Sequence, residues 1–156
     1  MSNAPIPRGS QTIVAGITVN DGKAALDFYR RAFGAEVRFL MTEPHGPKIA
    51  YAELQIGNSY FTLNDEIPQH NVLSPIARGG ATSGFMIYVA DCDSLYQQAL
   101  TAGATGIMPP MDMFWGDRMG ALTDPFGHRW AVATHKETLS EAEIEERRAK
   151  MMQAAK

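Results

Sequence analysis

One short stretch occurs twice in the chain: V-N-D at Val19 to Asp21 returns as V-A-D at Val89 to Asp91, 70 residues later. Two glycines repeat at nearly the same spacing, and the pairs are Gly34 with Gly103 and Gly57 with Gly127. A repeat of this length exceeds the units of solenoid proteins. The spacing therefore predicts two copies of one small module, packed together around a shared cleft.

Composition limits the classes of protein to which the chain can belong. It has 156 residues, of which 45% are hydrophobic and 20% charged, so we expect one domain or two half-domains sharing a core. The net charge of −3 and the lack of a basic stripe argue against nucleic-acid binding. One cysteine, Cys92, favours a reducing, cytoplasmic location. Residues 1–11 have no apolar run, so we expect a disordered lead-in rather than a signal peptide or a membrane segment.

The first module is predicted over residues 12–64, with the element order βαβββ. Asp21 is a suitable N-cap for a helix that ends at Gly34. The apolar stripe of this helix has helical spacing and consists of Ala25, Phe28, Tyr29, Ala32 and Phe33. The predicted strands are Thr12 to Val19, Glu36 to Thr42, Ile49 to Ile56 and Ser59 to Asn64.

The second module is predicted over residues 83–135, after a linker of residues 65–82 that is rich in proline and glycine. A helix begins after Asp91 and ends at Gly103. The predicted strands are Gly84 to Ala90, Ala104 to Met108, Arg118 to Thr123 and His128 to Thr134. A P-P-M-D-M-F-W-G loop (residues 109–116) separates the second strand from the third, and a D-P-F-G turn precedes the last strand.

Residues 136–156 are predicted to form a C-terminal helix. Ser140 and Glu143 form a capping box, and acidic residues precede basic ones along the segment. Its apolar stripe is thin, which is typical of a solvated helix packed loosely on the body. An arm that reaches a second subunit is the alternative.

Three sequence features together resemble the vicinal oxygen chelate superfamily, the group of glyoxalases, bleomycin-resistance proteins and extradiol dioxygenases. They are the two βαβββ units, the V-x-D before an F-Y-x-x-x-F-G-A helix, and the ending D-P-F-G-H-R-W. The M-F-W-G-D-R segment most resembles the PhnB-like branch. The resemblance covers residues 12–135 and implies an α+β fold of mixed, curved sheets around a cleft. It also implies a homodimer, since family members often pair or exchange modules between chains.

The resemblance further implies four metal positions, which in the family are His or Glu on the first and last strand of each module. Carried over to this chain, these positions are Val14, Thr62 (Phe61 if the register slips by one), Phe85 and Ala131. Three of these side chains have no lone pair, and a threonine alone is a poor ligand. We therefore predict no metal and no other cofactor at this site.

A cleft without a metal remains suited to a small molecule. If the strands alternate, one concave surface carries Val14, Gly16, Thr18, Thr62, Phe85, Ile87, Arg129 and Ala131. Apolar walls with a few polar groups are typical of ligand sites. We predict that Phe85 and Trp115 stack on a planar ligand and that Arg129 holds its carboxylate or phosphate. A collapsed cleft that Phe85 fills is the alternative.

Other candidate residues carry weaker signals. Tyr51 borders the predicted cleft, and Glu53 on the same strand face is the best candidate for a general acid or base. Asp117 either orients a ligand or forms a local ion pair with Arg118. The four histidines are His45, His70, His128 and His135, and none has a metal-ligand partner at strand or helix spacing. His128 is predicted to lie under the helix layer, and Cys92 to be inert core.

Two functions remain open from the sequence. The first is metal-independent binding or sequestration of a small, partly aromatic molecule in the cleft between the modules. The alternative is a lyase or isomerase of the glyoxalase type, with a non-standard metal site or with metal-free acid/base catalysis by Glu53. The sequence does not name the ligand, because the loops determine the shape of the pocket.

Overall fold

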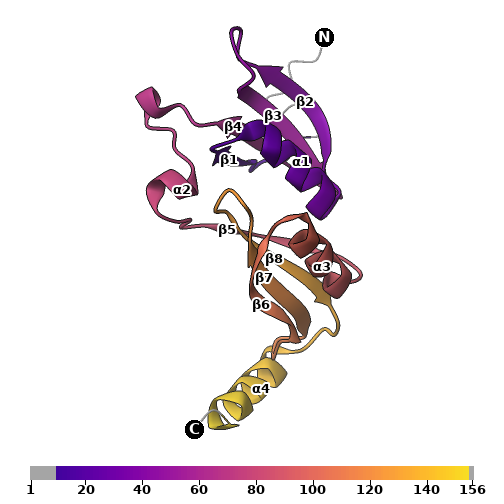
Figure 1. Ribbon diagram of the computed structural model, residues 1–156. Helices are drawn as coiled ribbons and strands as arrows, with labels where there is room; N and C mark the ends of the chain where they lie inside the picture. The colour runs from indigo at the N-terminus through magenta and orange to yellow at the C-terminus, as the bar shows by residue number, and fades with distance from the viewer. Residues whose placement is uncertain (1–9, 155–156) are drawn as a thin grey trace. The chain divides into compact units, whose positions relative to one another are not determined.

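The computed structural model describes residues 10–154 of the chain, so residues 1–9 of the predicted lead-in lie outside the described part. The chain divides into two compact units, one ending at Gly80 and one beginning at Ala81. Each unit contains one four-stranded sheet and one long helix packed on it (Figure 1). This α+β architecture confirms the two predicted βαβββ modules.

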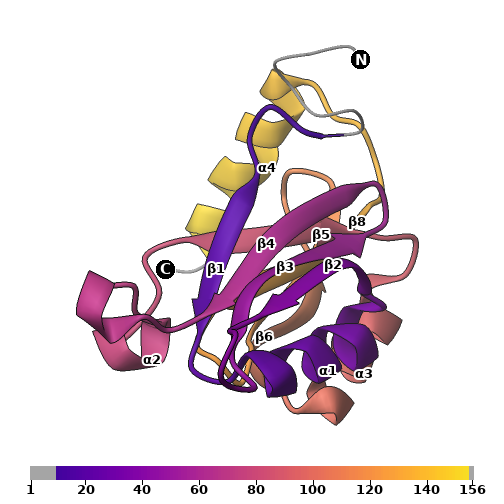
Figure 2. The same cartoon turned by 90° about the horizontal axis from the view of Figure 1, so that it is seen from above.

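The first sheet has the strand order β1-β4-β3-β2, which can be followed from β1 at its edge in Figure 2. Strands β1 and β4 are parallel, and the other neighbours are antiparallel. The elements of this unit are β1 (Ala15–Val19), α1 (Gly22–Phe33), β2 (Glu36–Thr42), β3 (Ile49–Ile56) and β4 (Ser59–Asp65). All five were predicted, with β1 beginning three residues later than expected and β4 ending one residue later.

Helix α1 begins and ends where the sequence indicated. The Asp21 carboxylate accepts a hydrogen bond from the Ala24 backbone N–H at 2.9 Å, which satisfies one free donor of the first turn. Gly34 ends the helix with φ of 65°, a left-handed conformation that glycine adopts without steric cost. The predicted apolar stripe is fully buried against the sheet.

The linker between the predicted modules contains short helices that the sequence analysis missed. A 3₁₀ turn, η1 (Pro68–His70), is followed by α2 (Pro75–Arg78). Ser74 caps α2 with its hydroxyl, and the proline at the first helical position has no N–H that needs a partner. Helices this short have no apolar period, so composition alone made this segment look irregular.

The second sheet repeats the first, with the strand order β5-β8-β7-β6. Strands β5 and β8 are parallel, and α3 packs on the face made by β6, β7 and β8. The elements are β5 (Gly84–Tyr88), α3 (Cys92–Ala102), β6 (Thr105–Asp112), β7 (Asp117–Thr123) and β8 (Arg129–His135). Each sheet therefore has one face covered by a helix and one open face.

Strand β6 corrects the prediction of a loop that begins at Pro109. The strand continues through Pro109 and Pro110 to Asp112, with irregular register between Met108 and Met111. Strand β6 lies at the edge of the sheet. On the outer side of an edge strand there is no neighbouring strand, so a proline that lacks an N–H there breaks no hydrogen bond of the sheet. The loop between β6 and β7 is therefore only residues 113–116.

Helix α4 (Glu141–Ala154) extends the chain beyond β8. The predicted capping box is present, since the Ser140 hydroxyl and backbone N–H both donate to the Glu143 carboxylate. No residue of α4 is buried, and the Arg147 guanidinium pairs with Glu137 at the base of the helix. Between residues 10 and 154, no helix is long and apolar enough to cross a membrane.

Candidate functional site

The open face of the second sheet carries exposed apolar side chains. Strand register places Met86 beside Ala131 and Tyr88 beside Ala133, on the face that α3 does not cover. Several large apolar side chains remain about half exposed, namely Met86 (49%), Tyr88 (58%), Ile107 (50%) and Met111 (49%). An apolar surface left uncovered in this way is typical of a binding surface.

Phe85 and Ile87 do not belong to this open face, which corrects the predicted cleft. Phe85 pairs in register with Trp130, their ring centroids lie 4.8 Å apart, and Trp130 is buried on the α3 side. Adjacent residues of a strand point to opposite faces of the sheet. The predicted alignment of β5 with β1 was offset by one residue, so it put Phe85 and Ile87 on the open face in place of Met86 and Tyr88. Phe85 still borders the hollow described below, so the predicted stacking of a ligand on Phe85 and Trp115 stays a prediction.

A hollow of about 400 Å³ lies on the open face of the second unit. Its side chains come from all four strands and include Met86, Ile107, Met119, Arg129 and Ala131. Arg129 is exposed and supplies the hollow's cation. Ala131 is half-buried, and the sheet places it centrally in the hollow, between Met86 and Ala121.

A polar cluster occupies the other end of the same open face. We call it the Asp117 cluster, and it consists of Asp117, Tyr88, Trp115 and His135. One oxygen of the buried Asp117 carboxylate lies 2.8 Å from Nδ1 of His135. The other oxygen accepts hydrogen bonds from the Tyr88 hydroxyl at 2.9 Å and from the Trp115 indole at 3.1 Å. The N–H edge of the Trp115 indole therefore faces Asp117.

These contacts shift the proton affinities of the cluster. Burial raises the pKa of Asp117, but the hydrogen bonds from His135, Tyr88 and Trp115 outweigh burial, and the pKa of Asp117 is lowered overall. The bond to Asp117 also raises the pKa of the Tyr88 hydroxyl. At neutral pH the cluster therefore holds a carboxylate and a protonated phenol.

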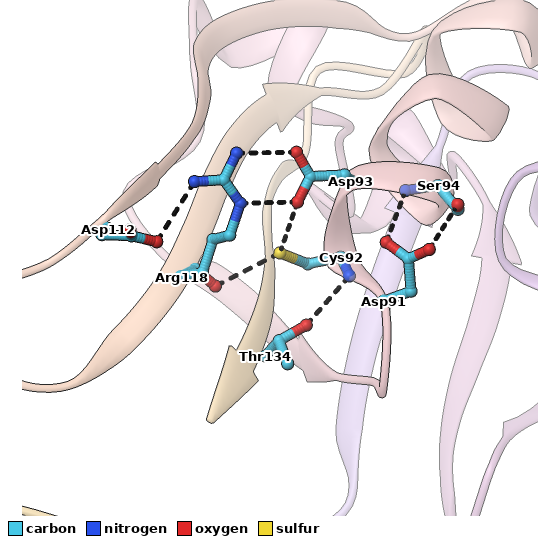
Figure 3. A network of polar contacts seen from close by, with 7 residues as sticks. All are labelled: Asp91, Cys92, Asp93, Ser94, Asp112, Arg118 and Thr134. Carbon is cyan, nitrogen blue, oxygen red and sulfur yellow. Dashed lines mark hydrogen bonds and ion pairs between the residues drawn. The ribbon is translucent and has the colours of Figure 1, made fainter. Parts of the chain in front are cut away.

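Arg118 does not pair with Asp117, although the two are adjacent in sequence. Successive residues of a strand point to opposite faces, so Arg118 lies on the α3 side. There its guanidinium donates two hydrogen bonds to Asp93 and one to Asp112 (Figure 3). The ion pair joins the start of α3 to the end of β6, so the expected Asp117–Arg118 pair is wrong.

Cys92 belongs to the same network and is buried beside it (Figure 3). Its backbone N–H donates to the Thr134 hydroxyl at 2.9 Å, and its thiol lies 3.3 Å from the Arg118 carbonyl oxygen. This placement confirms the expectation that Cys92 is a core residue. His128 is also buried, on the α3 side near Phe85, as predicted.

The remaining predicted residues lie on the open face of the first sheet. Thr62 pairs in register with Gly16, opposite the helix-facing Phe61. The Tyr51 hydroxyl donates to a Glu53 oxygen at 2.9 Å. Burial, together with the adjacent Glu53 carboxylate, raises the pKa of Tyr51.

The side chains available do not fit the divalent metal that the family resemblance implies. Gly84 and Met86 replace Phe85 on the open face, and neither supplies the nitrogen or oxygen ligand that such an ion prefers. In the described part of the chain, no group of three His, Cys, Asp or Glu side chains could hold a metal ion. The donor set therefore disagrees with a metal centre of the family type.

His135, Tyr88 and the open-face methionines were not predicted from the sequence as site residues. The position of His135 beside Asp117 can be derived from the β7–β8 hairpin. Thr123 pairs with Arg129 across the turn, and Asp117 therefore pairs with His135 six residues farther out on each strand. Counting outward from the turn would have joined the two residues. No comparable signal exists for Tyr88, because parallel pairing of β5 with β8 is not set by a short turn.

Comparisons with known proteins agree with this architecture. The family model described as the Glyoxalase/Bleomycin resistance protein/Dioxygenase superfamily matches residues 11–132. An uncharacterized protein of Mycobacterium bovis is 38% identical over 119 residues, which cover 74% of this chain and 78% of that protein.

Two solved structures share the fold at low sequence identity. Protein PA1353 from Pseudomonas aeruginosa has a TM-score of 0.64 at 21% identity, covering 82% of this chain and 100% of its own. A structure from Bacillus cereus described as a putative 3-demethylubiquinone-9 3-methyltransferase, PhnB protein, has a TM-score of 0.59 at 18% identity. It covers 80% of this chain and 99% of its own. At these identities the likeness concerns the fold alone.

Proposed function

Because the chain belongs to the Glyoxalase/Bleomycin resistance protein/Dioxygenase superfamily, we propose that it binds a small, partly aromatic molecule without a metal ion. The ligand occupies the hollow on the open face of β5, β6, β7 and β8. One observation carries this proposal: the hollow of about 400 Å³ is lined mostly by apolar residues, among them Met86, Met119 and Phe85, with Arg129 as its cation. Apolar walls with few polar groups are typical of small-molecule sites.

The wall chemistry indicates the kind of ligand. Methionine side chains are flexible and polarizable, so they adapt to planar rings and contact their edges favourably. Arg129 offers a planar guanidinium that can hold a carboxylate or phosphate through two hydrogen bonds. The proposed ligand is therefore a planar molecule with one anionic group.

A second candidate function rests on the Tyr51–Glu53 pair of the first unit. Glu53 accepts a hydrogen bond from Tyr51 and lies beside Thr62 on the neighbouring strand. A carboxylate in this setting can move a proton in a metal-free lyase or isomerase reaction. Glu53→Gln would remove that activity while leaving ligand binding at Arg129 unchanged.

Substitution of Met86 tests the binding proposal against a matched control. A panel of planar antibiotics and α-keto acids is screened by thermal shift, and hits are measured by titration calorimetry. Met86→Glu places a charge in the wall of the hollow, and we expect at least about tenfold weaker binding, which corresponds to about 1.4 kcal/mol. Met151→Glu changes an equally exposed methionine of α4 and should bind as the unmodified protein does. Equal binding by both variants would contradict the proposed location.

Elemental analysis tests the proposed metal independence. The protein is purified without added ions, and its content of zinc, nickel, manganese and iron is measured. We expect far less than one metal ion per chain, because the positions of the family's ligands carry no suitable donors. Stoichiometric metal that is lost on Glu53→Gln or His135→Gln would contradict this part of the proposal.

We further propose a homodimer located in the cytoplasm. An exposed apolar sheet face and an exposed edge strand favour pairing with a second copy. The single buried cysteine suits a reducing compartment. Light scattering at micromolar concentration should give twice the mass of the chain, and a monomer would exclude the dimer.

A further inference from the structure

Asp117, His135 and Thr138 form a linear chain of hydrogen bonds at the end of β8. The Asp117 carboxylate lies 2.8 Å from Nδ1 of His135, and Nε2 of the same ring lies 3.0 Å from the Thr138 hydroxyl oxygen. This is a carboxylate, an imidazole and a hydroxyl, in that order. The order is the one in which a base activates a hydroxyl nucleophile while a third group orients the base.

The buried carboxylate determines the tautomer of the imidazole ring. Ionised Asp117 has no proton to donate, so Nδ1 of His135 carries the proton and donates it. In the neutral ring, Nε2 is then an acceptor and faces the Thr138 hydroxyl, which donates to it. His135 is therefore placed to take the hydroxyl proton.

From this geometry we propose that Asp117, His135 and Thr138 form an acyl-transfer triad that hydrolyses small carboxylic esters, with Thr138 as the nucleophile. The proposal goes beyond the proposed binding function and does not depend on it, because none of the three residues lines the hollow at Arg129. Nor does it use the Tyr51–Glu53 pair.

The carboxylate is held firmly by the rest of the cluster. Tyr88 and Trp115 donate to the Asp117 oxygen that His135 does not use, and Asp117 is only 5% exposed. Its position is therefore independent of the reacting groups. Supporting hydrogen bonds of this kind keep a base oriented through a reaction.

The segment that carries Thr138 is turned back toward the sheet by backbone contacts. The N–H groups of Lys136 and Glu137 both donate to the Gly116 carbonyl, at 3.0 and 3.1 Å. A side chain at position 116 would meet the Glu137 carbonyl oxygen at 2.3 Å, so a glycine is required for this close approach. Thr138 follows three residues after His135, and the contact with Gly116 folds the chain so that the Thr138 hydroxyl reaches the His135 ring.

A substrate can reach the triad. The His135 side chain is 56% exposed, and Thr138 is exposed as well. A second hollow of about 490 Å³ lies beside them, lined in part by Gly116, Asp117 and Lys136.

The proposed reaction proceeds in two balanced steps. The Thr138 oxygen attacks the ester carbonyl carbon while its proton passes to Nε2 of His135, and collapse of the adduct expels the alcohol, which takes that proton. A water molecule then attacks the acyl-threonine, gives its proton to Nε2, and the proton returns to the threonine oxygen as the carboxylic acid leaves. Ester and water become acid and alcohol, and no oxidant or metal is consumed.

Covalent labelling by p-nitrophenyl acetate tests the nucleophile. We expect an initial burst of nitrophenol, and an acetyl group on the peptide that contains Thr138, detected by mass spectrometry. Thr138→Ala should abolish the labelled peptide and lower the rate at least about 100-fold. Thr138→Ser retains the hydroxyl and should retain the labelling. Thr101→Ala, at an exposed threonine of α3, is the matched control and should change nothing.

His135→Gln tests the base, because it removes the proton acceptor from an exposed position. We expect the burst to disappear at an unchanged melting temperature. Acetylation of lysines alone would overturn the proposal. A rate that falls in His135→Gln but is unchanged in Thr138→Ala would also overturn it, since His135 would then activate water without a nucleophilic threonine.

Discussion

Replacing Asp124 with alanine is expected to lower the free energy of unfolding of the second unit by about 3–5 kcal/mol. Asp124 is 4% exposed and lies in the turn before β8. One carboxylate oxygen accepts the backbone N–H groups of Phe126 and His128, both at 2.9 Å. The other accepts the Trp130 indole N–H at 2.8 Å.

The size of the effect follows from the number of donors that lose this acceptor. Three N–H groups lie at buried residues, and each costs about 1–3 kcal/mol when it is left without an acceptor. Partial access of water to the turn reduces the total below the simple sum. The alanine variant therefore loses the bonds that shape the turn and orient Trp130 under α3.

Two milder variants separate these contributions. Asp124→Asn keeps one acceptor oxygen for the turn and loses the acceptor for Trp130, and Trp130→Phe removes the indole donor itself. Urea unfolding followed by circular dichroism should rank Asp124→Ala as the most destabilised of the three. A change below about 1 kcal/mol for Asp124→Ala would show that this carboxylate does not organise the turn.

Gly22→Ala is expected to destabilise the first unit by about 3 kcal/mol, although alanine is the better helix former. A Cβ at position 22 would lie 2.5 Å from an Asp65 carboxylate oxygen and 2.5 Å from Cγ1 of Ile49. That carboxylate accepts the N–H of Gly22 at 2.8 Å and the N–H of Ile49 at 2.6 Å. The added methyl group would separate the start of α1 from the buried acceptor that joins it to β3.

Gly46→Ala is the matched control for this prediction. No atom lies within 4 Å of a Cβ built at position 46, and its φ is not in the left-handed region. Unfolding in urea should therefore leave Gly46→Ala within about 0.5 kcal/mol of the unmodified protein. Equal stability of the Gly22→Ala and Gly46→Ala variants would contradict the tight contact at Asp65.

Asp124 lies in a turn and Gly22 at the start of a helix, whereas the proposed ligand site lies on an open sheet face and the triad at the end of β8. Asp124 stabilises the turn before β8, and Gly22 bonds the start of α1 to Asp65. Met86 and His135 take no part in those contacts. The stability variants should therefore shift the melting temperature without removing ligand contacts. The functional variants at exposed positions should do the opposite.

The element order of the two modules and the ends of their long helices were predictable from the sequence. Asp21 and Gly34 have local chemistry, a side-chain cap and a left-handed glycine, that needs no tertiary information. The prolines of β6 show where local reasoning failed. Their effect depends on whether the strand lies at an edge, and strand order is a property of the whole sheet.

The residues of the site were harder to predict, because the sheet face to which a strand side chain points depends on how the strand is aligned with its neighbours. Phe85 was expected in the cleft and lies under α3, since an offset of one residue reverses every side chain of a strand. Arg129 and Ala131 were assigned correctly because they follow a turn whose length is set locally.

The sequence by itself determined that two βαβββ modules form. The features that indicate them are the repeated V-x-D, the helix caps and the turn glycines, and all of these act through contacts between near neighbours in the chain. Only the tertiary structure decided which side chains share the open face. It alone joined Tyr88 to Asp117, at a sequence separation of 29. Parallel pairing of β5 with β8 brings Tyr88 to Asp117, and no local pattern in the chain encodes that contact.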